Sequence, residues 1–195
     1  MDVTIVVATY GSSEWINIAN NFAMPNAASF NVPIVRVHGG SSLAEARNAG
    51  AALVRTEWIC FLDADDELSA DYFEEMGKAT GDLRAPRLLF CDIEQDTVSE
   101  PFDLTRRNMA VGNPCPIGTL IRKSMFEDVG KFWEEPVYED WSLFRRAWLL
   151  GATIEHTNAR YLAYNLGGRN SPPDNVHEVL EQIKSSHETW MMEII

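Results

Sequence analysis

The stretch Trp58-Ile59-Cys60-Phe61-Leu62-Asp63-Ala64-Asp65-Asp66-Glu67 joins an apolar run to a cluster of four carboxylates. The run predicts a buried strand over residues 58–62, and the carboxylates follow where that strand ends. Open α/β sheets bind ligands outside the carboxyl ends of their strands, so a ligand is expected beside this cluster. Carboxylates this close repel one another, a cost that a bound cation or basic neighbours commonly offset, and no Lys or Arg lies within the cluster itself. Asp63 and Asp65 are therefore candidate ligands of Mg²⁺ or Mn²⁺, shared with substrate phosphates.

Three other interpretations of this acidic stretch stay open. It can be a solvated turn without a ligand. An EF-hand loop fits its register in part, but Leu68 stands where that loop needs Gly, and a strand precedes it instead of a helix. The nucleophilic Asp-x-Asp-x-Thr of haloacid-dehalogenase phosphatases would need Thr or Val at Glu67 and normally lies on the first strand.

Composition restricts the partners of the chain. With 195 residues, 46% of them hydrophobic, the chain is long enough for one well-filled core and short for two. The net charge of −13 argues against broad binding to nucleic acid or anionic membrane and favours a small molecule with a cation. Cys60, Cys91 and Cys115 are expected to be reduced thiols of the core. With neither a leader nor a run of eighteen apolar residues, a cytoplasmic protein is expected.

Apolar runs alternate with helical segments along the chain, which predicts βαβ units and a parallel sheet. Ser12 or Ser13 is expected to cap a first helix that runs through Phe22, and Ser42 with Glu45 has the spacing of a capping box. The other expected helices are 43–54, 69–79, 123–129, 138–150 and 174–195. The expected strands are 3–8, 34–37, 58–62, 88–93, 117–122, 153–155 and 161–165.

Two segments of the chain allow more than one interpretation. Residues 94–116 are predicted to be a long irregular connection, either a plain loop or a mobile lid. The helix over 174–195 carries an apolar stripe on one face. This stripe is expected to pack on its own domain, with a homodimer contact or an interfacial membrane helix as the alternatives.

A second cluster of polar residues, Glu139-Asp140-Trp141, opens the helix expected over 138–150. A helix start favours a carboxylate and is expected to hold its pKa low. Glu139 or Asp140 is thus either a helix cap or an ionised general base for an incoming hydroxyl.

These clusters belong to a longer series of motifs. The series consists of Val-Thr-Ile-Val-Val-Ala-Thr-Tyr at 3–10, Gly-Ser-Ser-Leu-Ala-Glu-Ala-Arg-Asn-Ala-Gly at 40–50, Leu-Asp-Ala-Asp-Asp at 62–66, Val-Gly-Lys-Phe at 129–132 and Tyr-Glu-Asp-Trp-Ser-Leu at 138–143. In this order the motifs resemble those of the family 2 glycosyltransferases, whose A-type fold binds nucleotide sugars. The resemblance extends over roughly residues 3–170.

The resemblance implies an α/β fold of one domain, the Rossmann-like fold of nucleotide-diphospho-sugar transferases, with a mostly parallel sheet flanked by helices. Residues 1–93 would form the donor and metal half, 94–170 the acceptor and base half, and 174–195 the C-terminal amphipathic helix. The implied enzyme is a metal-dependent, inverting hexosyltransferase that uses a nucleotide-sugar donor, with a UDP-sugar as the family's commonest choice. The hydroxyl acceptor is left unidentified.

The resemblance also implies a role for individual residues. Asp65 would bind Mn²⁺ or Mg²⁺ directly, and Asp63 would contact the donor ribose or metal-bound water. Arg47 would pair with the diphosphate or the acidic cluster, or form a buried structural ion pair. The remaining expected residues are the base Asp140 with Glu139, the nucleoside-pocket residues Thr9 and Tyr10, and the acceptor-side residues Trp141 and Asp66.

The chain departs from the family pattern in two places. It has room for one strand before residue 40 where the family has two, so the aspartate that reads the nucleobase has no counterpart. Asn165 to Ser171 holds no His where the family often has a metal ligand, and His38 and His156 are either substitutes or ordinary polar side chains. A non-catalytic carbohydrate- or nucleotide-binding module and a sugar-phosphate nucleotidyltransferase stay open as alternative functions.

Overall fold

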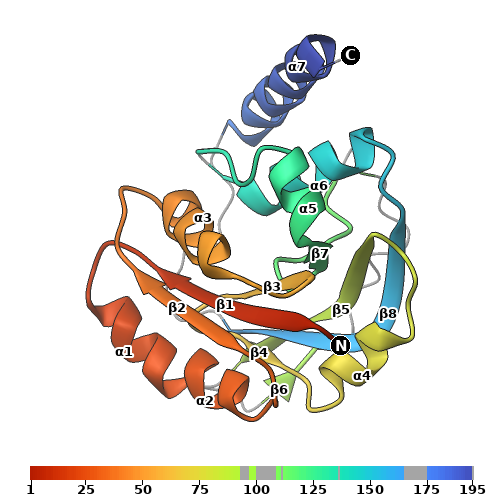
Figure 1. Cartoon of the computed structure of the whole chain (residues 1–195). Helices are drawn as coiled ribbons and strands as arrows, with labels where there is room; N and C mark the ends of the chain where they lie inside the picture. The colour runs from red at the N-terminus through yellow and green to blue at the C-terminus, as the bar shows by residue number, and fades with distance from the viewer. Residues whose placement is uncertain (93–96, 100–108, 111, 136, 165–174, 195) are drawn as a thin grey trace.

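The computed structural model describes residues 1–92, 97–99, 109–110, 112–135, 137–164 and 175–194 (Figure 1). An eight-stranded sheet with the order β2-β1-β3-β7-β5-β8-β4 lies at its centre, and β6 pairs with β5. Strands β1, β2, β3, β5 and β8 run in one direction, and β4, β6 and β7 run in the other. The strands are β1 Val3–Thr9, β2 Ile34–His38, β3 Trp58–Leu62, β4 Glu67–Leu68, β5 Leu83–Asp92, β6 Thr97–Val98, β7 Leu120–Arg122 and β8 Ile154–Tyr164.

Helices cover both faces of this sheet. In Figure 1, α1, α2 and α4 lie on one face and α3, α5 and α6 on the other, while α7 projects beyond α6. The helices are α1 Glu14–Asn21, α2 Ala23–Ala28, α3 Leu43–Leu53, α4 Tyr72–Gly77, α5 Lys123–Asp128, α6 Glu139–Leu149 and α7 Val176–Ile194. One cluster of buried apolar side chains runs from Val3 to Ile183 and so joins the first strand to the last helix.

Local signals place several elements where the sequence predicts them. Strand β3 occupies residues 58–62, and all five of its residues are buried. Helix α3 begins at Leu43, and the Oγ of Ser42 accepts a hydrogen bond from the Glu45 N–H at 3.1 Å. Only this half of the capping box forms, because the Glu45 carboxylate accepts hydrogen bonds from the N–H and hydroxyl of Ser41 instead.

Tertiary pairing changes other predicted elements. The two strands expected over 153–155 and 161–165 form one strand, β8, because the chain between them also pairs in parallel with β5. Asn165, the last residue of the expected strand, lies outside the described residues. Strand β5 begins at Leu83 instead of residue 88 and passes Pro86 through an irregularity in that ladder. The predicted helix 69–79 shortens to α4, since the hydroxyl of Ser69 donates to Asp71 at 2.6 Å and does not cap the helix. Helix α2 and strands β4 and β6 were not predicted, and β6 lies within the connection over 94–116 that was expected to be irregular.

The connection over 94–116 is described only in part, with 94–96, 100–108 and 111 outside the described residues. Within the described part, Met109 and residues 114–116 are buried, so this end of the connection belongs to the core and is not a lid. Cys60, Cys91 and Cys115 are buried free thiols, as predicted. None of the helices that the structure describes has both the length and the apolarity that a membrane crossing requires.

Candidate active site

The carboxyl ends of β1, β2 and β3 meet at one edge of the sheet because these strands pair in parallel. Thr9 ends β1 and is buried, and its hydroxyl lies 3.0 Å from Nδ1 of His38, which ends β2. Tyr10 follows with a half-buried side chain. The residues predicted to line a nucleoside pocket therefore lie at the same edge as the acidic cluster that follows β3.

Burial alternates along the acidic cluster. Asp63 and Asp65 are half-buried, whereas Ala64 and Asp66 are buried. The Asp66 carboxylate accepts a hydrogen bond from the Tyr164 N–H at 2.9 Å. Burial, together with the charges of Asp63 and Asp65, raises the pKa of Asp66. Asp63, Asp65 and Glu67 are thus the partly open carboxylates of the cluster. Glu67 accepts a hydrogen bond from the Tyr164 hydroxyl, while Asp66 anchors the loop to β8.

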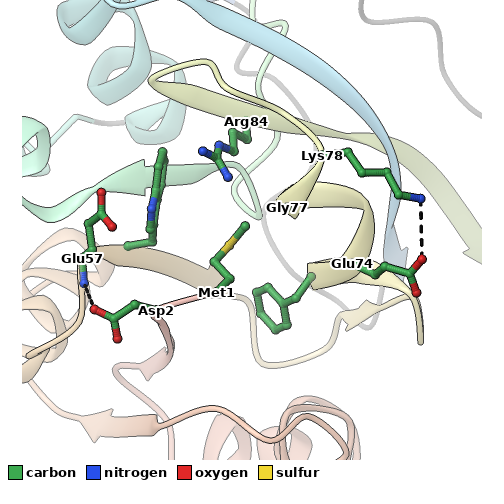
Figure 2. Close-up of a pocket in the computed structure, with 9 residues that line it drawn as sticks. Met1, Asp2, Glu57, Glu74, Gly77, Lys78 and Arg84 are labelled. Atoms are coloured by element: carbon green, nitrogen blue, oxygen red, sulfur yellow. Dashed lines mark hydrogen bonds and ion pairs between the residues drawn. The ribbon is translucent and has the colours of Figure 1, made fainter.

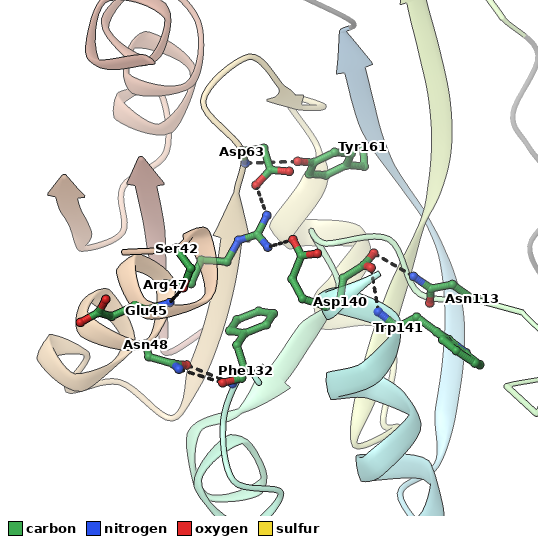
Figure 3. A network of polar contacts seen from close by, with 11 residues as sticks. Ser42, Glu45, Arg47, Asn48, Asp63, Asn113, Phe132, Asp140, Trp141 and Tyr161 are labelled. Atoms are coloured by element: carbon green, nitrogen blue, oxygen red, sulfur yellow. Dashed lines mark hydrogen bonds and ion pairs between the residues drawn. The ribbon is translucent and has the colours of Figure 1, made fainter. Parts of the chain in front are cut away.

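Arg47 of α3 joins the acidic cluster to the start of α6 (Figure 3). Its Nη2 donates to Oδ1 of Asp63 at 2.5 Å, and its Nη1 donates to Oε1 of Glu139 at 2.6 Å. The guanidinium is only 3% exposed. Burial works against its charge, but attraction to the two carboxylates prevails and raises the pKa of Arg47. The two motifs that predicted chemistry, residues 62–66 and 138–143, therefore each contribute a carboxylate that binds Arg47.

Asp140 lies beside this bridge (Figure 3). Its Oδ1 accepts the Trp141 N–H at 2.7 Å, and its Oδ2 accepts the side-chain amide of Asn113 at 2.8 Å. Burial and the charge of Glu139 raise the pKa of Asp140 to about 7, against the lowering effect of the Trp141 N–H and of Arg47. The expectation of a low pKa at this helix start was wrong, because burial outweighs the helix dipole here.

The two predicted acceptor-side residues, Trp141 and Asp66, lie in the interior. Trp141 is 2% exposed, and its indole N–H donates to the Met109 carbonyl at 3.1 Å. Asp66 is 6% exposed. The structure thus places both residues next to the site as supports and leaves little of either side chain open to a ligand.

Comparison with known families gives a match to the first part of the chain. Residues 4–85 match the family model described as glycosyl transferase family 2. Over these residues the chain is similar to that family. The match includes Thr9, Arg47, Asp63 and Asp65, and the helix that carries Asp140 lies beyond it.

Solved structures support the same fold. S. aureus TarS 1–349 in complex with UDP-GlcNAc aligns with a TM-score of 0.69 and 14% sequence identity, over 95% of this chain and 66% of that one. TarS 1–349 in complex with UDP gives a TM-score of 0.58 at 15% identity, over 95% of this chain and 65% of that one. S. aureus TarS gives 0.57 at 17% identity, over 95% of this chain but 39% of that one. At these identities the likeness shows the fold alone, and the chain spans less than two thirds of each TarS chain. No curated protein sequence matches.

The arrangement of carboxylates after β3 suits a divalent cation that is shared with a substrate. Among the described residues, no three His, Cys, Asp or Glu side chains form a ready-made metal cage. Asp63 and Asp65 are half-buried carboxylates, and one or two carboxylates plus substrate phosphates are a usual ligand set for Mg²⁺. His156 lies in the first half of β8, away from Tyr161, which contacts the Asp63 N–H. Residues 165–171, where the family often has a His, are outside the described residues.

Sequence reasoning missed three residues that support the site. Tyr161 accepts the Asp63 N–H at 3.3 Å and also bonds the Asp66 carboxylate. Asn48 pairs through its amide with both the N–H and the carbonyl of Phe132, at 3.0 and 2.9 Å (Figure 3). Asn113 bonds Asp140. Asn48 stands directly after Arg47 in the family motif, which was an available signal, whereas Tyr161 and Asn113 are brought in only by the fold.

A pocket of about 570 Å³ lies elsewhere, at the amino ends of β1 and β3 (Figure 2). Trp58 of this pocket packs against two guanidinium groups. The centroid of its ring lies 4.2 Å from Cζ of Arg84 and 4.4 Å from Cζ of Arg122. Since Trp58 begins β3 and Asp63 follows its end, this pocket opens at the edge opposite the candidate site. The pocket residues are Met1, Asp2, Glu57, Trp58, Phe73, Glu74, Gly77, Lys78 and Arg84.

Proposed function

We propose that this chain transfers a hexosyl group from a UDP-sugar to a hydroxyl acceptor, with inversion at the anomeric carbon and with Mn²⁺ or Mg²⁺. The observation that carries the proposal is the bridge of Arg47 between Asp63 and Glu139. This bridge holds Asp63, which with Asp65 is suited to a donor diphosphate and its cation, near another carboxylate, Asp140, whose pKa is about 7.

Asp140 has the properties of a general base. A base works best when its pKa lies near the working pH, and burial brings Asp140 into that range. As the acceptor oxygen bonds to the anomeric carbon, its proton passes to the Asp140 carboxylate. The bond from that carbon to the diphosphate oxygen breaks on the opposite face, so the configuration inverts.

The donor side of the reaction is assigned to the residues after β3. Asp65 and Asp63 would hold the cation together with the diphosphate oxygens, and the cation would neutralise the charge on the departing diphosphate. Thr9 and Tyr10 would contact the nucleoside from the end of β1. The choice of UDP is supported by the structures of TarS with UDP-GlcNAc and UDP.

The first prediction concerns Asp65→Asn and Asp140→Asn. With Mn²⁺ and a panel of UDP-hexoses that includes UDP-GlcNAc, we expect both variants to lose at least 100-fold of the UDP release, because general-base catalysis alone contributes ~10²–10⁴-fold. Asp128→Asn changes an exposed carboxylate at the end of α5 and serves as the matched control. Calorimetry should show that Asp140→Asn still binds the donor and that Asp65→Asn loses metal-dependent binding.

Full UDP release by either variant would contradict the proposed mechanism. Binding of the donor by the wild type without any release of UDP would favour the non-catalytic module. Release of pyrophosphate from a nucleoside triphosphate with a sugar phosphate would favour the nucleotidyltransferase. A homodimer through α7 stays a prediction, which sedimentation of the purified chain tests.

A further inference from the structure

Asn113 makes two hydrogen bonds that together fix the direction of its side-chain amide. Its Oδ1 accepts the backbone N–H of Cys115 at 3.0 Å, and its Nδ2 donates to Oδ2 of Asp140 at 2.8 Å. Because a backbone N–H only donates, the oxygen of the amide faces Cys115. The NH₂ group is therefore the part that faces Asp140, as Figure 3 shows.

The backbone around Asn113 is rigid. Pro114 and Pro116 follow it, and each ring fixes its own φ angle. The chain from residue 114 to residue 121 is buried throughout, with Cys115 and Thr119 at 0% exposure. The bond from Asn113 to Cys115 is an Asx-type turn that starts this buried segment. The amide is thus presented to Asp140 from a core-anchored turn.

We propose that Asn113 is a positioning residue of the transfer reaction, which holds the carboxylate of Asp140 in one orientation and stabilises its ionised form through a donated hydrogen bond. This inference rests on the proposed role of Asp140 as the base. The Trp141 N–H holds one carboxylate oxygen and Asn113 holds the other, so the plane of the carboxylate is fixed from two elements. Each oxygen keeps a lone pair with which to accept the acceptor's proton.

Several charged and titratable groups around Asp140 act on its ionisation, and the hydrogen bond that the Asn113 amide donates acts together with them. Glu139 on the same helix and Asp63 after β3 both disfavour the ionised carboxylate, and Arg47 of α3 favours it. The thiol of Cys115 also faces Asp140, but burial raises its own pKa, so it stays neutral. Hydrogen bonds to an ionised carboxylate favour that form, so the amide of Asn113 acts in the same direction as Arg47.

The test compares Asn113→Asp with Asn113→Ala. Asp forms the same turn with Cys115 but has no NH₂ group for Asp140, whereas Ala loses both bonds. We expect the acidic limb of the pH–rate profile for UDP release from UDP-GlcNAc with Mn²⁺ to rise by at least one pH unit in Asn113→Asp. At pH 6.5 the rate of UDP release should therefore fall about tenfold, and it should recover at higher pH. The KM for the donor should stay unchanged. Because Asn113→Asp also places a second carboxylate beside Asp140, which raises the pKa of Asp140 by repulsion, the uncharged variant Asn113→Ala decides between the two roles. The inference predicts that the acidic limb also rises in Asn113→Ala, whereas a purely structural role predicts that Asn113→Ala keeps the wild-type acidic limb and loses rate equally at every pH.

A second measurement does not depend on activity. The carboxyl carbon of Asp140 is titrated by ¹³C NMR in the wild type, Asn113→Asp and Asn113→Ala, with Asp140→Asn to assign the signal. A higher midpoint in Asn113→Ala supports the inference, and an unchanged midpoint in Asn113→Ala overturns it, because any rise confined to Asn113→Asp comes from the added charge. If Asp140→Asn keeps full UDP release, the proposed base is wrong, and the NMR midpoints still decide whether Asn113 acts on Asp140.

Discussion

Asp140 illustrates how the surroundings of a single carboxylate decide its chemistry. The sequence predicts its helix position, where the dipole favours the charged form. Burial and the neighbouring Glu139 depend on how α6 packs, and they raise the pKa instead. The position of this residue at a helix start was therefore predictable from the sequence, but the direction in which its pKa is shifted was not.

The raised pKa also predicts how stability depends on pH. A carboxyl whose pKa is raised from about 4 in the unfolded chain to about 7 in the folded one holds more protons when folded. Its contribution to the free energy of unfolding is thus fully present below pH 4 and is lost as the pH rises to 7. Between pH 5 and 8, urea unfolding should show a smaller decline for Asp140→Asn than for the wild type. An equal decline in both would mean that burial does not raise this pKa.

Elements were predictable where their signals are local. Strand β3 is a continuous apolar run, and α3 has its cap at Ser42. The single strand β8 was not predictable, because only its pairing with β5 holds it together across residues 156–160. The same holds for β4, a strand of two residues that exists through its pairing with β8.

Helix α5 ends in a Schellman motif that offers a test at this scale. The N–H of Lys131 donates to the Phe126 carbonyl and that of Gly130 to the Glu127 carbonyl, both at 3.0 Å. Lys131 is exposed and has a φ of 65°, a left-handed conformation that costs a side chain about 1 kcal/mol. Thermal unfolding should therefore show Lys131→Gly to be more stable than Lys131→Ala by roughly that amount. Gln182 is exposed within α7 and serves as the control. There Gln182→Ala should be more stable than Gln182→Gly, because Gly destabilises a helix interior. A more stable Gly variant at both positions, or a more stable Ala variant at both, would contradict the strain assigned to Lys131.

At the scale of the whole molecule, the proposed donor half, residues 1–93, and the proposed base half, residues 94–170, are joined through α3. Consecutive residues of this helix make the connection, Arg47 to Glu139 and Asn48 to Phe132. The family motif gave a role to Arg47 but none to Asn48, and the partners of these residues lie 92 and 84 residues away along the chain. Sequence patterns thus pointed to Arg47, Asp63 and Glu139, and the contacts between them and the part of Asn48 required the fold.

This arrangement predicts different consequences for two similar asparagines. Asn26 pairs with both backbone groups of Leu68, at 2.9 and 3.0 Å, just as Asn48 does with Phe132. Each Ala variant loses two hydrogen bonds and should be destabilised by about 2 kcal/mol in urea unfolding. Asn26→Ala acts within the donor half and should keep UDP release at temperatures where it stays folded.

Asn48→Ala should also lose activity, because Asn48 adjoins Arg47 and fixes α3 against the segment that leads into α6. We expect a fall in kcat for UDP release of about tenfold or more, since small misplacements of reacting groups are costly. Rates are compared at 10 °C, where both variants are folded. Equal kcat values for Asn48→Ala and Asn26→Ala would show that the connection through α3 stabilises the molecule without aligning the two halves of the site.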